Sequence, residues 1–233
     1  MKRILTTLSQ KWPEYLLEIL VITVGILGAY TLNNWNENTK TKQLEIKYLK
    51  EMHTNLKFDL QDIDFNIDFN ESRYASNKIV LEHLRKKQPY HDSLDFHLSN
   101  LLYSTRTLPN TSAYESLTSR GLEIISNDSL RAHITNVYSV HFHNVIDFEH
   151  ADDHPHQYQV MWQPVMNAIE VDSLGGSAKP INYDAMMNDI KFKNALASNV
   201  TIRRYMLDTY KGLRSHITRL IAHIESEVDV LEE

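Results

Sequence analysis

An uncharged apolar run, from Ile19 to Leu32, constrains this chain more than any other feature. Trp12 and Trp35 bracket the run, and a helix would separate the two rings by roughly 35 Å, close to the thickness of a bilayer with its interfaces. The residues that follow the run are bulky and rich in amides, so they offer no site for a signal peptidase. The sequence therefore predicts an uncleaved transmembrane helix over residues 12–36.

One stripe of this predicted span combines small residues with a carboxyl and an amide group. Five side chains recur at steps of three or four and share a helical face: Glu18, Ile22, Gly25, Ala29 and Asn33. Small residues at this spacing let two helices approach closely in lipid, and an ionisable group inside a span is costly unless it faces a partner or water. We expect this stripe to contact another helix. The alternative is that Glu18 reaches the membrane interface while the small residues face lipid.

Two motifs resemble a known family. The first runs through the span, with Glu-Ile from residue 18, Gly-Ile-Leu from residue 25, Ala29, and Asn-Asn-Trp-Asn-Glu from residue 33. The second consists of Tyr-Glu-Ser-Leu from residue 114, Gly121, Ile-Ile from residue 124, Asn127 and Leu-Arg from residue 130. Together they resemble a family of uncharacterised single-span bacterial membrane proteins without an assigned activity. The resemblance implies an anchored helical domain and adds no catalytic residues.

Composition excludes several classes of function. The chain has 24 Lys and Arg against 30 Asp and Glu, a net charge of −6, whereas nucleic-acid binding normally needs a basic face. It has no cysteine, which excludes disulfides, thiol catalysis and zinc–thiolate sites. No cofactor is predicted. The predicted partners are the lipid bilayer and either a second copy of the chain or another membrane protein, without nucleic acid.

A long helix is predicted after the anchor, over residues 37–88, because this stretch has no glycine or proline and its apolar residues recur at helical steps. The main stripe contains Leu49, Met52, Leu56, Leu60, Ile63, Ile67, Tyr74, Leu81 and Leu84. A second stripe, expected to widen the buried face, contains Ile46, Phe58, Phe65, Phe69 and Ile79. Asparagines between residues 66 and 77 are a potential break in this helix.

The segment 89–183 is predicted to form a helical head. Ser112 and Glu115 have the spacing of a capping box, Gly121 is placed to end the helix that follows, and Asn127 is placed to begin the next. Residues 158–171 read as a further helix, and residues 172–180 as a loop.

The C-terminal segment, 184–233, is predicted to be helical with a break near residues 194–199. Its heptad-like stripe indicates a helix that packs along a partner helix: Met206, Tyr210, Leu213, Ile217, Leu220, Ile224 and Leu231. The natural partner is the helix at 37–88. The predicted fold class is therefore all-α, with a basic segment at 1–11, a membrane helix continuing into a stalk helix, and C-terminal helices packed antiparallel on that stalk.

Histidines are the chemically suggestive residues of this sequence. If a helix runs through residues 141–156, four side chains share one face at steps of four, three and four: His143, Asp147, His150 and His154. Two histidines four apart suit a divalent metal, but the glutamate of the H-E-x-x-H metalloprotease motif is missing. These residues are weak candidates for a divalent-metal site or for a cluster that gains charge near pH 6, and a solvated polar face explains them more simply.

The sequence favours a membrane-anchored interaction or scaffold subunit that is not an enzyme and that associates with itself. The alternative is an extracytoplasmic sensor that binds a ligand or metal through residues 141–156. A short basic N-terminus before the span favours the inner membrane with the C-terminal domain outside the cytoplasm, although a cytoplasmic domain stays open.

Overall fold

The structure of this chain is a computed structural model that describes the backbone of residues 2–233 and the side chains of residues 12, 13 and 15–233. The side chains of the predicted basic segment 1–11 lie outside the described residues. The chain divides into two compact units, residues 1–47 and residues 48–233, and each is described by itself.

The first unit is helical throughout its described residues and belongs to helix α1, Lys2–Arg85. An 18-residue window of this helix has a mean hydropathy of 1.9, and none of the window is buried. The hydroxyl groups of Thr23 and Thr31 donate to the carbonyls of Ile19 and Leu27, each at 2.7 Å, so the helix satisfies them internally. One N-terminal helix is thus long and apolar enough to cross a membrane.

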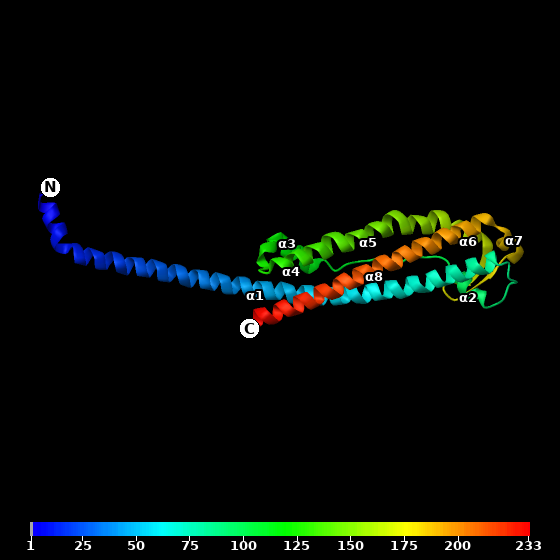
Figure 1. Ribbon diagram of the computed structural model, residues 1–233, viewed down its shortest axis with the longest axis horizontal. Helices are drawn as coiled ribbons and strands as arrows, with labels where there is room; N and C mark the ends of the chain where they lie inside the picture. Colours follow the sequence, from blue (N-terminus) through cyan, green and yellow to red (C-terminus); the bar gives the residue numbers. More distant parts are fainter. Residues whose placement is uncertain (1) are drawn as a thin grey trace. The chain divides into compact units, whose positions relative to one another are not determined.

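In the second unit, α1 pairs with the long C-terminal helix α8, Ile190–Glu232, in antiparallel order (Figure 1). The order is set by side-chain contacts that run in opposite directions along the two helices: Lys50 with Glu232, Asp64 with Arg214, and Asn77 with Asn199. The C-terminal stripe from Met206 to Ile224 is buried, as its spacing predicted. The expected break at 194–199 is wrong, because Asn199 hydrogen-bonds to Asn77 of α1 and to the carbonyl of Leu101 without interrupting its own helix.

The buried face of α1 is narrower than expected. Most of the main stripe is buried, whereas Phe58, Phe65 and Ile79 of the second stripe are exposed. The asparagines between 66 and 77 do not break α1, because Asn66, Asn70 and Asn77 are buried and hydrogen-bonded. The helix ends three residues earlier than predicted, and Lys87 then takes a positive φ of 51°.

A bent helical arm forms the third long element, and it alternates α-helical and π-helical turns. Its parts are α4 (Asp128–Asn136), η2 (Val137–Phe142), α5 (His143–Phe148), η3 (Glu149–Asp153), η4 (His156–Met161) and α6 (Trp162–Ala168). We call residues 128–168 the arm. It packs along α8.

The spacing of buried residues explains the π turns of the arm. Buried positions recur every four residues: Val145, Glu149, Asp153, Gln157, Met161, Val165 and Ile169. In an α-helix of 3.6 residues per turn, each step of four would rotate the side chain by about 40°, so the series would leave the packed face within a few steps. The wider π turns counter this rotation and keep the series pointing inward.

Short elements connect the long ones, and some of their caps differ from expectation. They are α2 (Leu94–Ser99), α3 (Ser112–Arg120), the 3₁₀ turn η1 (Leu122–Ile124) and α7 (Tyr183–Asn188). Asn127 caps α4 and Gly121, at φ +110°, ends α3, as predicted. The predicted capping box at Ser112 is wrong, because Ser112 is already helical and Thr111 donates to Glu115 instead.

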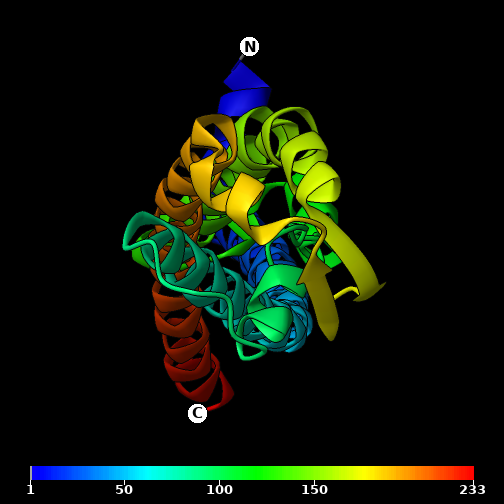
Figure 2. The ribbon, with the colours of Figure 1, turned by 90° about the vertical axis from the view of Figure 1, so that its right-hand side faces the viewer.

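The all-α prediction is wrong at one place, where the arm ends in an antiparallel two-stranded sheet. Strands β1 (Ile169–Ser173) and β2 (Ser177–Pro180) replace the end of the predicted helix 158–171 and most of the predicted loop. Gly175 makes the turn at φ +76°, and its N–H donates to the carbonyl of Ser99 at 3.0 Å. α2 packs against this hairpin (Figure 2).

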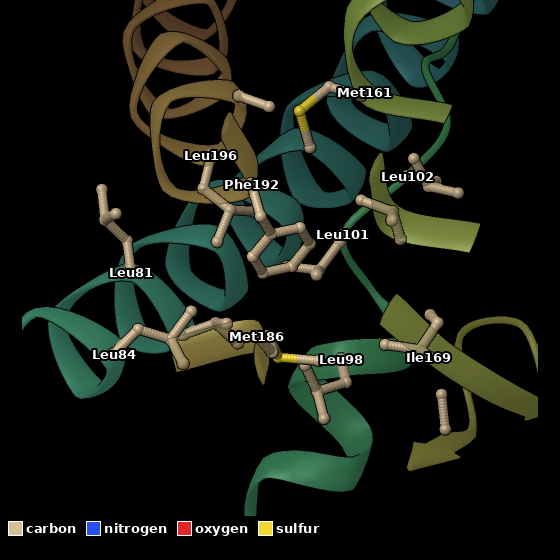
Figure 3. Close-up of a cluster of buried hydrophobic side chains, with 14 of the residues drawn as sticks. Leu81, Leu84, Leu98, Leu101, Leu102, Met161, Ile169, Met186, Phe192 and Leu196 are labelled. Carbon is tan, nitrogen blue, oxygen red and sulfur yellow. The ribbon is translucent and has the colours of Figure 1, made fainter. Parts of the chain in front are cut away.

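The hairpin covers one end of an apolar core. Ile169 and Ala178 turn inward from the two strands, as the period of two requires. In Figure 3 the ring of Phe192 points toward Leu101, and α1, α2, α7 and the arm contribute the surrounding side chains. This core fixes the ends of α1, α8 and the arm, and a polar cluster lies beyond it along the same helices.

Candidate functional site

The predicted membrane stripe lies on one open face of α1. Glu18, Ile22, Gly25, Ala29 and Asn33 are all exposed. A Cβ added to Gly25 would have nothing within 4 Å among the described residues. The structure thus leaves this face free for an external helix or for lipid.

The predicted histidine face does not form a metal centre. His143 Nε2 and Asp147 Oδ2 lie 3.2 Å apart on the exposed side of the arm, and the rings of His150 and His154 are 5.7 Å apart. His154 also contacts the carbonyl of Thr105 through Nε2 at 3.1 Å. Within the described side chains, no group of three or more His, Cys, Asp and Glu residues is placed to hold a metal ion.

A buried polar cluster instead joins the arm to α1, α8 and the loop before α3. We call it the Arg203 network, and its members are Asn70, Asn77, Thr105, Thr107, Glu149, Asp153, Gln157, Asn199, Arg203 and Tyr210. All ten are buried, and six of them are fully so: Asn70, Asn77, Glu149, Asn199, Arg203 and Tyr210. Polar groups at this depth need partners, so the geometry of each decides whether the packing is stable.

Glu149 sits at one end of the network and only accepts hydrogen bonds. The backbone N–H of Thr107 donates to both carboxylate oxygens at 3.0 Å, and its hydroxyl donates at 2.7 Å. The Tyr210 hydroxyl donates to the same carboxylate at 2.6 Å, and Thr105 lies 3.1 Å from that hydroxyl. Donors surround the carboxyl group, which is the arrangement of an ionised carboxylate.

Arg203 occupies the middle of the network and connects three elements. Its Nη1 donates to Asn70 of α1 at 2.6 Å and to Asp153 of the arm at 3.3 Å. Its Nη2 donates to the carbonyl of Tyr103. Tyr103 has a φ of 77°, which a non-glycine residue rarely adopts, so this contact coincides with local backbone strain.

The network continues from Asp153 to Asn77, two turns beyond Asn70 on the same face of α1. Gln157 Nε2 contacts Asp153 at 3.4 Å and donates to Asn199 Oδ1 at 2.7 Å. Asn199 Nδ2 in turn donates to Asn77 Oδ1 at 3.0 Å. Asn70 Nδ2 donates to Thr105 Oγ1 at 3.1 Å and joins the two parts of the network. Hydrogen bonds thus run without a gap from Glu149 to Asn77, through residues that are distant in the chain.

Burial dominates the electrostatics of the network. It lowers the pKa of Arg203, while the charge of Asp153 acts in the opposite direction, and a guanidinium stays protonated at any physiological pH. Burial, the charge of Glu149 and their hydrogen bond raise the pKa of Tyr210. Tyr210 therefore stays a neutral donor.

The network fixes the arm relative to α1 and α8, and it does not expose a reactive group to solvent. Its ionisable side chains are hydrogen-bonded and enclosed, so a solute reaches them only if the arm separates from α1 and α8. Within the described residues, Arg203 Nε and Gln157 Oε1 are buried without a hydrogen-bond partner. Sequence reasoning missed the network because it followed the histidines of the arm and not the steps of four that Glu149, Asp153 and Gln157 share with apolar neighbours. Asn199 and Arg203 interrupt the apolar stripe of α8, and this interruption was a second indication in the sequence of a buried polar site.

Comparison with known families covers part of this arrangement. The model of a family of unknown function (DUF6090) matches residues 18–157, more than half of the chain. The chain belongs to the DUF6090 family. Neither a curated protein nor a solved structure matches it.

The DUF6090 match agrees with the resemblance to an uncharacterised family. The matched residues begin at Glu18, the first residue of the membrane stripe, and include Glu149, Asp153 and Gln157 of the arm. Arg203 and Tyr210 lie beyond the match, on α8. The DUF6090 description assigns no activity, so a function has to be argued from the geometry.

Proposed function

We propose that this protein is a single-span, inner-membrane interaction subunit that works by association, first with a second copy of itself, and not by catalysis. The observation that carries the proposal is the open stripe of α1, where a carboxyl, an amide and two small residues lie exposed within an apolar helix. An ionisable side chain is unfavourable in lipid without a partner, and small residues permit close helix contact. A second helix with the same stripe supplies a partner for the ionisable side chain and a surface for close contact.

The second unit supports a role as a folded body that the membrane anchor presents to a partner. Its titratable core groups are enclosed, and the arm, α1 and α8 form a closed helical body (Figure 2). A sensor that uses His143, Asp147, His150 and His154 is less well supported, because His154 is engaged with Thr105 and the pair at His143 is exposed to water.

Replacing Gly25 with leucine should weaken self-association in the membrane. The larger side chain separates two helices that pack on this stripe, and contacts of this kind are worth on the order of 1 kcal/mol, or about fivefold in the dimer constant. Crosslinking of the full chain in membranes measures the change. Ile26→Leu, on another face, is the control and should leave the crosslinked fraction unchanged.

A deletion of residues 2–32 completes this test. If the wild type, the Gly25→Leu variant and the deletion give the same oligomer, the anchor does not drive assembly. If none gives an oligomer, the proposal of self-association is wrong.

We also propose that the second unit lies outside the cytoplasm, because a short basic segment precedes the apolar helix. A reporter that is active only outside the cytoplasm should therefore be active when fused after Glu233. Activity of a cytoplasm-only reporter at the same position would reverse the orientation.

A further inference from the structure

Four imidazoles meet between the arm and α8, and none of them belongs to the predicted metal face of His143, His150 and His154. His133 of α4 and His141 of η2 face His223 and His216 of α8. His133 Nδ1 and His223 Nδ1 are 3.2 Å apart, and the rings of His141 and His216 stack with centroids 3.4 Å apart. The two pairs follow the antiparallel order of the helices, and we call them the histidine junction.

The hydrogen bonds of the junction require unprotonated ring nitrogens. In the pair of His133 and His223, one nitrogen must accept the proton of the other. Arg219 Nη2 lies 3.0 Å from His216 Nδ1, and an arginine can only donate. Asn136 Nδ2 likewise faces His141 Nε2 at 3.2 Å as a donor. Protonation of the rings removes these acceptors.

The charges that act on the junction oppose protonation. Burial lowers the pKa of His133, His141 and His216, and Arg219 lowers each further. The neighbouring imidazoles also lower the pKa of His133 and His216. Each added proton therefore raises the cost of the next.

Carboxylates of the surrounding elements have other partners. Those of the arm and α8 pair as follows: Asp128 with Arg131, Asp147 with His143, and Glu227 with Asn127. On α1, Asp64 pairs with Arg214 and Asp59 accepts from the backbone of Asn110. Among the groups that shift the pKa values of the junction, none is a carboxylate.

We propose that the histidine junction is an acid-sensitive latch that holds residues 128–142 of the arm on α8 at neutral pH and releases them when its rings gain protons. The Arg203 network holds the arm further along through groups other than histidine, although His156 beside it also has a pKa that burial lowers. Residues 162–168 of α6 contain no histidine and stay in place. Release uncovers Leu130, Ile134 and Val137, which are otherwise buried. Acidification would thereby present an apolar surface, a property that goes beyond the proposed anchoring and does not depend on it.

The direction of the pH effect follows from linkage. Rings whose pKa is lower in the folded state bind fewer protons there than in the unfolded chain, so the latch is fully stable above about pH 6.5 and loses stability as the pH falls. Asp59 acts in the opposite direction. Burial raises its pKa to about 6, so its protonation on acidification favours the folded state.

Hydrogen exchange of the full chain in detergent tests the latch, with rates corrected for the intrinsic effect of pH. Between pH 7.5 and pH 5.5, protection of residues 128–142 should fall by about tenfold, while residues 162–168 of α6, which contain no histidine, keep theirs. Asp59→Asn removes the opposing titration and should enlarge the loss. Equal protection of residues 128–142 at both pH values in the wild type and in Asp59→Asn would overturn the proposal.

A matched pair of variants assigns the effect to the junction. The double variant His133→Asn and His216→Asn places an amide near each Nδ1 and removes one titrating ring from each pair, so the loss of protection should shrink. The double variant His143→Asn and His150→Asn removes two exposed histidines of the same arm and should keep it. The reverse result would refute the assignment. If the first variant does not fold, His133→Asn alone tests the pair of His133 and His223 in the same way.

Discussion

Replacing Arg203 with methionine should lower the free energy of unfolding by about 3–5 kcal/mol, because the change leaves Asp153 charged and buried without its partner. It also removes the donors to Asn70 and to the carbonyl of Tyr103. Urea unfolding of the full chain in detergent, followed by circular dichroism, measures the loss. The double variant Arg203→Met and Asp153→Leu removes both charges and should recover much of the stability.

Arg214→Met is the matched control for this series. Arg214 lies on the same helix and pairs with Asp64, but both side chains are about half exposed. An exposed ion pair contributes about 0–1 kcal/mol, so this variant should be nearly as stable as the wild type. Equal losses for the Arg203 and Arg214 variants would mean that the network does not hold the arm.

A second large effect is expected in the apolar segment of α1. The double variant Val21→Asp and Leu27→Asp should release the protein from membranes, because each aspartate near the centre of a span costs about 2.5–3.5 kcal/mol. Together the two changes amount to about 5–7 kcal/mol, or on the order of 10⁴-fold in membrane partition. Sedimentation of membranes after an alkaline wash measures the retained fraction.

The exposed aromatics of α1 provide the control for this experiment. Phe58 and Phe65 are 60% and 62% exposed, close to the 61% of Val21 and the 58% of Leu27, but they lie in the second unit. Phe58→Asp and Phe65→Asp should leave membrane retention unchanged. If the variant of Val21 and Leu27 still sediments after the wash, the segment does not anchor the protein.

The helical periodicities of the sequence predicted the long elements because they depend on local spacing. The stripe of α8 from Met206 to Ile224 and the cap at Asn127 are of this kind, since each is decided within a few residues of the chain. The hairpin was not predicted, because its local pattern is weak. Ile169 to Ser173 is too short for its alternation to compete with the helical pattern that precedes it.

The polar sites could not be predicted in the same way, because they depend on the register between distant helices. Arg203 meets Asp153 across 50 positions of the chain, and His133 meets His223 across 90. Within the arm, a pattern of 3.6 favours the face of His143 and His150, whereas the π turns place Glu149 and Asp153 inward. The number of residues per turn thus decides which side chains of the arm face inward and can form a site.

The antiparallel order of α1 and α8 also sets how the second unit responds to force. Its first residue, Tyr48, is close in the chain to Lys50, which contacts Glu232 at the other end of the unit. Tension applied between Tyr48 and Glu233 therefore loads the contacts one after another, starting with Lys50 and Glu232 and reaching the pair of Asp64 and Arg214 later. A helical pair whose contacts break one at a time separates at lower tension than a pair whose contacts are all loaded together. The Arg203 network comes late in this order of contacts, so we expect the separation of the two helices to stop there until the tension rises.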